Sequence, residues 1–398
     1  MNQKRNVLVV FPDMIVGGAT TALVAFLRKI DYEKNNVDLL FLNNGTERLD
    51  ELPREVNVLP DAATVDLLRP KIRLEKVLDF VVTGKCFLAL YETIKAKEKP
   101  FFAFFQMATN QMLARIHCQY SSSVEKEYDL AIAYLELWPT VYVAEKVRAK
   151  KKVAWCHVDY PAARLNPMLD EKYYQQMDQI FCVSPECAEH FQVCFPQLQN
   201  RVDWTENLID EEGIRQKADS QEELEHAFTD YAGFRIVTVA RLDSYTKGLD
   251  RITSIVGLLK ADGLDFRWYL IGGGPDAVQL RQSIAEKNIS DRLSMLGEKR
   301  NPYPYMKRAD LFVLASRNEG KPITVTEAQI LNTPILVTEY PAARGQLEGS
   351  GGCIVENSEE ALYQRLRSIL NGKEAPEKTR YLRKGQMEQL EILQECRL

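Results

Sequence analysis

The sequence predicts an α/β protein with two doubly wound parallel sheets, one in each half of the chain. The chain has 398 residues, 45% of them hydrophobic, and a chain of this length usually forms more than one core. Short continuous apolar runs recur along both halves. Stretches with helical spacing separate these runs, as expected for parallel strands that are covered on both faces.

The apolar runs give the expected strands in chain order. In the first half they are residues 6–11, 36–42, 128–134, 151–157 and 178–184. In the second half they are residues 234–240, 266–272, 293–297, 310–316, 334–338 and 353–356. A highly charged stretch that is poor in apolar residues, 209–233, lies between the two sets, as is typical of a linker.

These runs predict the domain organisation. We expect an N-terminal Rossmann-like domain over residues 1–205 and a C-terminal domain over residues 206–375. A final helix, residues 376–398, is expected to cross back to the N-terminal domain.

One region interrupts the alternation of strands and helices. Residues 66–120 are too long and too helical for a simple crossover, and they hold nine Lys/Arg against five Asp/Glu. Basic residues beside apolar and aromatic ones are the composition of a helix that lies on an anionic membrane. The alternative is that the apolar face packs on the sheet and the lysines are solvated.

Composition excludes several classes of protein. A net charge of −5 and an isoelectric point near 5.7 argue against a surface that follows nucleic acid. The eight cysteines are scattered without metal-ligand spacing, which fits reduced thiols in a cytosol. The first apolar run is too short for a signal peptide or a membrane span. We therefore expect a cytoplasmic protein without a metal site.

The candidate functional residues follow the strands of the second half. Ligands bind beyond the carboxyl ends of the strands in open parallel sheets. Arg241 follows one strand, and Lys247 precedes a helix a few residues later. Two cations near a helix N-terminus are a candidate diphosphate site, and a solvated Arg and Lys are the alternative. The glycines 272–274 admit a ligand or a neighbouring backbone, or only form a turn.

The stretch "RNEGKPITVTEA", residues 317–328, carries two carboxylates, Glu319 and Glu327, eight positions apart. Ionised carboxylates accept hydrogen bonds from the paired hydroxyls of sugars. Taken alone, such spacing arises by chance. Its place after a strand, in register with Arg241, Lys247 and the glycines, makes it a candidate sugar site.

Together, Arg241, Lys247 with Gly248, "GGGP" and the pair Glu319–Glu327 resemble the nucleotide-sugar domain of the retaining, family-four-like glycosyltransferases of the Glu-x7-Glu group. The similarity covers the second half of the chain. In the first half, "GGATTALVAFL" (17–27) and "VAWCHVDY" (153–160) are similar, more loosely, to the glycine loop and the histidine-bearing strand of that family. "ENLID" (206–210) resembles its hinge. The resemblance implies the GT-B fold, in which two Rossmann-like domains face each other across a cleft.

The resemblance also implies roles for individual residues. Arg241 and Lys247 would bind the donor diphosphate, Glu319 the hydroxyls of the donor sugar, and Glu327 the ribose diol. His157 would lie beside the anomeric carbon and would form the catalytic group with Glu319, Arg241 and Lys247, although a packed histidine is the alternative. The other implied donor contacts are Gly17, Gly18, Gly273, Gly320, Lys321, Pro322 and Ile323. Lys321 replaces a bulky apolar residue common in the family, so it would alter sugar or acceptor contacts.

The implied activity is transfer of a hexose-type sugar, with retention of anomeric configuration, from a nucleotide-diphosphate donor. UDP-sugars are favoured and GDP-sugars come second. The acceptor would be a glycan, a lipid-linked or a wall-polymer molecule, and lipid-linked acceptors favour peripheral contact with the inner face of the cell membrane. The sequence contains no Asp-x-Asp triplet, so we expect a metal-independent enzyme without cofactor and without a nucleic-acid partner.

Two alternatives remain open. The chain could be a non-catalytic GT-B subunit that binds acceptor, or it could catalyse another GT-B reaction, as a sugar phosphorylase or an epimerase. The four donor-site charges favour the transferase.

Overall fold

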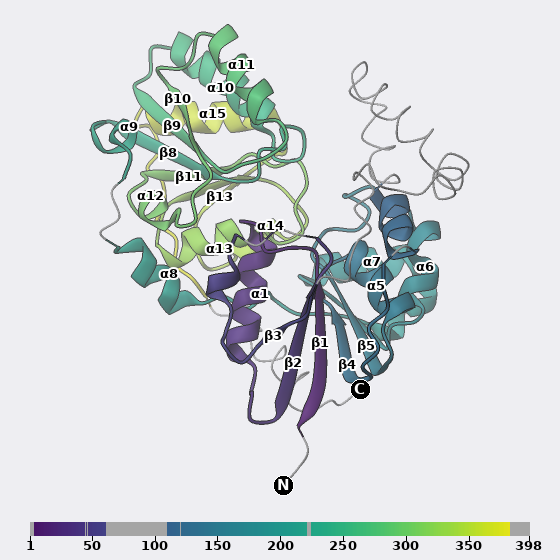
Figure 1. Ribbon diagram of the computed structural model, residues 1–398. Coiled ribbons are helices and arrows are strands. Elements are labelled where there is room, and N and C mark those ends of the chain that lie inside the picture. The colour runs from purple at the N-terminus through teal and green to yellow at the C-terminus, as the bar shows by residue number, and fades with distance from the viewer. Residues whose placement is uncertain are drawn as a thin grey trace, which may run out of the picture.

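The computed structural model describes residues 4–43, 45, 47–60, 110–119, 121–220 and 224–382. The chain forms two lobes, each built on one sheet (Figure 1). We call them the N-terminal lobe, which carries β1–β7, and the C-terminal lobe, which carries β8–β13. All the strand pairs are parallel. The predicted fold class of two doubly wound parallel sheets is therefore confirmed.

The N-terminal sheet has seven strands in the order β3-β2-β1-β4-β5-β6-β7. The strands are β1 (Arg5–Phe11), β2 (Asn35–Phe41), β3 (Asn57–Val58), β4 (Tyr128–Ala133), β5 (Ala149–Cys156), β6 (Gln179–Cys182) and β7 (Val202–Trp204). The helices are α1 (Gly18–Lys29), α5 (Trp138–Lys146), α6 (Pro167–Tyr174) and α7 (Pro185–Cys194), with the 3-10 helices η1 (Leu49–Glu51) and η3 (Pro196–Arg201). The sequence missed β3 and β7, since runs this short show no periodicity.

The C-terminal sheet has six strands in the order β10-β9-β8-β11-β12-β13. The strands are β8 (Phe234–Val239), β9 (Phe266–Ile271), β10 (Leu293–Gly297), β11 (Leu311–Leu314), β12 (Ile335–Thr338) and β13 (Cys353–Val355). The helices are α10 (Leu249–Ala261), α11 (Ala277–Glu286), α12 (Tyr303–Lys307), α13 (Ile323–Ile330), α14 (Ala343–Leu347) and α15 (Glu359–Leu370). The chain order reverses beside β8, which lies between β9 and β11, and such a switch point is where open sheets bind ligands.

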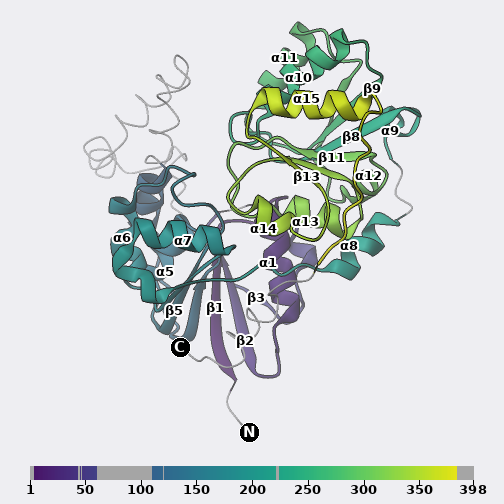
Figure 2. The same ribbon diagram turned by 180° about the vertical axis from the view of Figure 1, so that it is seen from behind.

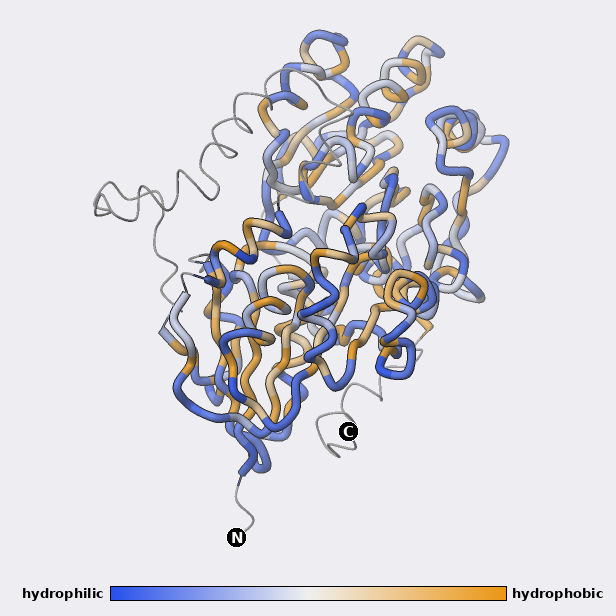
Figure 3. Tube along the Cα trace, turned by 90° about the vertical axis from the view of Figure 1, so that its right-hand side faces the viewer, coloured by the Kyte–Doolittle hydropathy of each residue, from blue (hydrophilic) through white to orange (hydrophobic). Residues whose placement is uncertain are grey.

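The strands bury both faces, as their continuous apolar runs predicted. In β1, Val7 and Val9 belong to one core, whereas Leu8 and Val10 belong to another on the opposite face. The view from behind shows α5, α6 and α7 together on the side away from α1 (Figure 2). Apolar residues follow the strands and hydrophilic ones the turns at the lower rim (Figure 3).

One apolar core continues from one lobe into the other. It joins Phe26 of α1 and Trp155 of β5 to Val325 of α13 and Phe312 of β11. Helices α1 and α13 lie against each other where the lobes meet (Figure 1). The positions of loops from the two lobes are therefore fixed relative to each other by packing.

The charged linker forms two short helices, α8 (Glu211–Ala218) and α9 (His226–Thr229). The Asp210 carboxylate accepts a hydrogen bond from the Gly213 N–H at 3.0 Å, which caps α8. Helix α8 packs against α12 and α13 of the C-terminal lobe. The division of the chain at residue 206 stays a prediction.

Two predicted segments lie mostly outside the residues that the structure describes. Of the basic insert 66–120, the structure describes residues 110–119, and these ten residues are helical. Of the final helix 376–398, residues 376–382 are described and form neither helix nor strand. Within the described ranges, no helix combines the length and the apolar character needed to cross a membrane.

Candidate active site

Lys247 and Glu319 form an ion pair at the carboxyl ends of two neighbouring strands. The Lys247 Nζ lies 2.6 Å from the Glu319 Oε1, and the Ser316 hydroxyl donates to the same oxygen at 2.6 Å. The side chains are 24% and 10% exposed. The structure therefore brings together two residues that the sequence proposed from different loops, and it adds Ser316, which the sequence did not single out.

Gly248 makes this ion pair possible. Its φ is +64°, and a Cβ at this position would lie 2.0 Å from the carbonyl oxygen of Ala315 at the end of β11. Only glycine allows such a close approach of the two backbones. The start of α10 therefore lies directly against the end of β11, where Lys247 reaches Glu319.

Arg241 lies at the end of β8 with 67% of its side chain exposed. Its guanidinium is 3.5 Å from the Asp243 carboxylate, too far for a strong hydrogen bond. Among the described residues it makes no contact with Glu319. Its charge is therefore accessible to a ligand at the same edge of the sheet.

Gly273 follows β9 and lies beside an acidic side chain. A Cβ at this position would lie 2.6 Å from the Glu298 carboxylate, which follows β10. Burial raises the pKa of Glu298, and the neighbouring Glu47 of the N-terminal lobe raises it further.

Gly320 brings the two lobes into contact at His157. A Cβ at Gly320 would lie 2.5 Å from the His157 carbonyl oxygen, so a larger residue would force the loops apart. The loop after β5 and the loop after β11 thus meet. His157 and Glu319, one residue before Gly320, belong to the same junction.

The imidazole of His157 is held as a neutral group. Desolvation lowers its pKa to about 4, an effect that a hydrogen bond to the Tyr134 backbone opposes. Its Nε2 is buried and has no hydrogen-bond partner among the described residues. The His157 backbone N–H donates to the buried carboxylate of Glu136 at 2.9 Å. Sequence reasoning missed Glu136, although it stands two positions after the predicted strand 128–134.

The glycines after β1 lie at the start of α1, next to the start of α13. Gly18 is the first residue of α1, and a Cβ there would lie 3.6 Å from Ile323, the first residue of α13. A Cβ at Gly17 would meet open space. Two helix N-termini, whose unpaired N–H groups favour anions, therefore converge between the lobes.

Pro322 and Lys321 form the turn before α13. Pro322 is the N-cap of α13, one position before the first helical residue. Lys321 forms an ion pair with Glu206, with its Nζ 2.5 Å from the carboxylate and both side chains mostly buried. Its charge is therefore partnered by the linker between the lobes, a contact for which the local sequence carries no signal.

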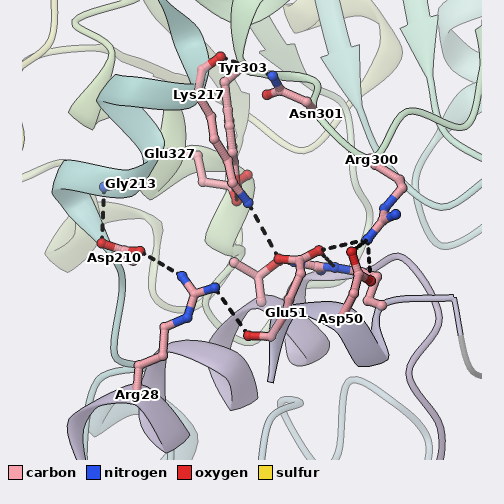
Figure 4. A network of polar contacts seen from close by, with 12 residues as sticks. Arg28, Asp50, Glu51, Asp210, Gly213, Lys217, Arg300, Asn301, Tyr303 and Glu327 are labelled. Carbon is pink, nitrogen blue, oxygen red and sulfur yellow. Dashed lines mark hydrogen bonds and ion pairs between the residues drawn. The ribbon is translucent and has the colours of Figure 1, made fainter. Parts of the chain in front are cut away.

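Glu327 lies in a different environment from Glu319. It is 5% exposed and accepts a hydrogen bond from the Tyr303 hydroxyl at 2.9 Å. Burial raises the pKa of Glu327 to about 7, and this rise is limited by the Tyr303 hydrogen bond and the charges of Arg48 and Lys217. Figure 4 shows Lys217 and Tyr303 beside it.

A network of ion pairs surrounds Glu327 and joins the lobes. Lys217 of α8 lies 3.4 Å from the Glu51 carboxylate, which Arg48 also binds at 2.6 Å. Arg300 binds both oxygens of Asp50, at 2.6 and 2.8 Å (Figure 4). These partners are far apart in the sequence, so sequence reasoning could not pair them.

Comparisons with known proteins agree with this geometry. Residues 221–385, which include the whole second sheet, match the family described as "Glycosyl transferases group 1". That part of the chain is therefore similar to the group 1 glycosyltransferase family, as the motifs predicted.

Curated relatives share only part of their length with the chain. An N-acetylgalactosamine-N,N'-diacetylbacillosaminyl-diphospho-undecaprenol 4-alpha-N-acetylgalactosaminyltransferase of Campylobacter jejuni is 27% identical over 209 residues, 52% of this chain and 54% of the relative. The amylovoran biosynthesis glycosyltransferase AmsK of Erwinia amylovora is 30% identical over 148 residues, 35% of this chain and 36% of the relative. The chain thus matches about half the length of the first relative and less of the second.

Solved structures match nearly the whole chain. Anabaena HepE in complex with UDP and glucose has a TM-score of 0.60 and 13% identity, covering 93% of this chain and 90% of that one. Staphylococcus aureus TarM in complex with fondaparinux, alpha-GlcNAc-glycerol and UDP has a TM-score of 0.59 and 9% identity, covering 99% and 95%. At such identities the likeness shows the fold, which is GT-B.

Proposed function

We propose that this protein is a retaining glycosyltransferase. It transfers a hexose-type sugar from a nucleoside-diphosphate donor, a UDP-sugar first and a GDP-sugar second, to a glycan, lipid-linked or wall-polymer acceptor. The observation that carries the proposal is the pair Lys247–Glu319, held at 2.6 Å at the switch point of the second sheet. A cation and a sugar-binding carboxylate are needed side by side where a sugar–diphosphate bond breaks.

In the proposed reaction, negative charge develops on the diphosphate as the glycosidic bond breaks. Lys247 and the exposed Arg241 supply fixed positive charge at that place, and preorganised charge of this kind is usually the largest single contribution to catalysis. A metal ion is then not required. The helix starts at Gly18 and Ile323 add backbone N–H groups for phosphate or hydroxyl oxygens.

Glu319 is the proposed ligand of the donor sugar. The hydrogen bonds that it accepts from Lys247 and Ser316 both fall on Oε1. Its Oε2 has no hydrogen-bond partner among the described residues and is available to a sugar hydroxyl. His157, neutral and with a buried Nε2, is the proposed second polar contact of the sugar from the N-terminal lobe.

The relatives support the substrate classes. One is named for a transfer to a diphospho-undecaprenol-linked acceptor and another for the biosynthesis of a polysaccharide, amylovoran. The solved structure of HepE holds UDP and glucose. We therefore propose a role in bacterial glycan assembly with a UDP-sugar as the first donor to test.

The test is a panel of UDP-, GDP- and ADP-sugars, read by thermal stabilisation and by donor hydrolysis. We expect one nucleotide class to raise the melting temperature and to be hydrolysed slowly, with activity retained in EDTA. NMR of the transferred product should show the anomeric configuration of the donor. Inversion, or an absolute requirement for Mn²⁺ or Mg²⁺, would contradict the proposal. Donor binding without turnover would favour the non-catalytic subunit.

We propose further that the protein contacts the inner face of the cell membrane peripherally through the basic insert 66–120. The support is the composition of the insert and the lipid-linked acceptor named for one relative. Flotation with liposomes at low salt tests it. Recovery only with anionic lipid is expected, and equal recovery in the soluble fraction with and without anionic lipid would contradict it.

A further inference from the structure

Arg164 of the N-terminal lobe reaches the loop of the C-terminal lobe that carries Arg241 and Lys247. Its guanidinium donates a hydrogen bond to the Tyr245 hydroxyl at 2.9 Å and lies 5.5 Å from the centre of that ring. Both side chains are exposed, Tyr245 by 47%. Arg164 is therefore an exposed cation at the junction of the lobes. Its partner Tyr245 stands two positions before Lys247 in the sequence.

The loop that carries Arg164 is held firmly. The buried carboxylate of Asp159 accepts a hydrogen bond from the Ala162 N–H at 3.0 Å and binds the His190 Nδ1 at 2.6 Å. The Asp159 carbonyl accepts from the Ala163 N–H at 2.8 Å. Arg164 ends this turn with a φ of +57°, which non-glycine residues seldom adopt. Such conformations concentrate at binding sites, where the fold holds a side chain in place.

The charge of Arg164 has no acidic partner within the described part of the chain. A second arginine, Arg317, also lies over Tyr245, with its guanidinium 4.8 Å from the centre of the ring, but it forms two hydrogen bonds of 2.7 Å with the Asp250 carboxylate. Among the described residues, the Arg164 guanidinium has the uncharged Tyr245 side chain as its partner. A guanidinium binds phosphate or carboxylate with two parallel hydrogen bonds, and the adjacent hydroxyl of Tyr245 offers a further one.

We propose that Arg164, with Tyr245, binds an anionic group of the acceptor, a phosphate or a carboxylate. Arg241 and Lys247 of the C-terminal lobe are assigned to the donor diphosphate, whereas Arg164 comes from the opposite lobe and from the loop that follows His157. This inference rests on the proposed function. The contact of Arg164 and Tyr245 with the acceptor makes the enzyme selective for acceptors that carry negative charge next to the hydroxyl that is glycosylated.

The test uses the full chain saturated with a nucleoside diphosphate, the one that corresponds to the nucleotide-sugar that binds best in the panel, so that the nucleotide part of the donor site is filled. Glucose 1-phosphate and methyl glucoside serve as charged and neutral probes, and their dissociation constants are measured by NMR titration. We expect wild type to bind glucose 1-phosphate more tightly than methyl glucoside. Arg164→Gln should weaken the affinity for glucose 1-phosphate about tenfold and leave the affinity for methyl glucoside unchanged, and Arg164→Lys should have an intermediate affinity for glucose 1-phosphate. Tyr245→Phe should lose part of the preference. Arg281→Gln, an exposed arginine on α11, is the matched control.

The outcomes separate this inference from the proposed function. If no nucleoside diphosphate binds wild type, the proposed function fails. If one binds but glucose 1-phosphate shows no preference, or binds Arg164→Gln as tightly as wild type, the acceptor site alone is wrong. If Arg164→Gln weakens the affinity for the nucleoside diphosphate itself tenfold, Arg164 binds the donor and the inference is overturned.

Discussion

Glu319 and Glu327 stand eight positions apart on one loop-helix segment, yet the fold gives them opposite surroundings. Glu319 lies on the loop with the Lys247 ammonium at 2.6 Å. Glu327 lies inside α13, buried against the neutral Tyr303 hydroxyl at 2.9 Å. The Lys247 ammonium forms an ion pair with the carboxylate of Glu319, whereas burial favours the protonated form of Glu327. Identical side chains in one motif are therefore expected to respond differently to mutation and to pH.

The largest effect is expected from the cation beside Glu319. Lys247→Ala removes fixed charge from the leaving diphosphate and should lower turnover by roughly two to three orders of magnitude. Steady-state kinetics with the identified donor measure it. Lys373→Ala, an exposed lysine after α15, is the control and should keep full turnover. A folded Lys247→Ala enzyme with near-normal turnover would remove Lys247 from the mechanism.

The next effect is on the pH dependence of stability, where Glu327 and His157 act in opposite directions. The folded pKa of Glu327, about 7, is above its ordinary value of 4.5, so its contribution to stability is lost as pH rises from 4.5 to 7. The folded pKa of His157, about 4, is below its ordinary value of 6.5, so stability is lost as pH falls from 6.5 to 4.

Denaturant unfolding at pH 5, 6 and 7 separates the two residues. Glu327→Gln should gain stability relative to wild type as pH rises, by on the order of 2 kcal/mol across this range. His157→Gln should show the opposite trend. If the free energy of unfolding changes with pH in the same way for wild type and both variants, neither group is as desolvated as the structure indicates.

The hydrogen bond from Tyr303 to Glu327 is expected to have an effect of similar size. Tyr303→Phe leaves a buried carboxyl without its hydroxyl donor and should reduce the free energy of unfolding by about 1.5–3 kcal/mol. Tyr305→Phe is the matched control, because within the described residues the Tyr305 hydroxyl accepts a single hydrogen bond, from the Glu225 backbone N–H at 3.2 Å. Equal losses in both variants, measured by denaturant unfolding at pH 7, would show that the carboxyl is not special.

The smallest effect concerns donor affinity. If the Glu327 carboxylate binds the ribose diol, protonation removes an acceptor, so affinity for the nucleotide-sugar should rise about tenfold from pH 6 to pH 8. A nucleotide-sugar suits this calorimetric titration because its diphosphate does not titrate in that range. Glu327→Gln should make the affinity independent of pH. The same slope in both proteins would assign the titration to another group.

The sequence by itself predicted five of the seven strands of the first sheet and all six of the second, because a strand buried on both faces leaves a local apolar run. It also placed Lys247 and Glu319 together, although they are 72 positions apart, since the carboxyl ends of neighbouring parallel strands share one edge. The motif around Glu319 indicated the family from the sequence alone, because its residues are close together in the chain.

Only the tertiary structure decided the surroundings of those residues. Arg300 and Asp50, 250 positions apart, and Lys321 and Glu206, 115 apart, are paired by the way the lobes meet. No local pattern records such a contact, because each partner alone looks like a solvated charge. The burial of Glu327, the desolvation of His157 and the reach of Arg164 to Tyr245 likewise follow from packing between lobes. These features set pKa and charge at the site, and they depend on distances that only the fold fixes.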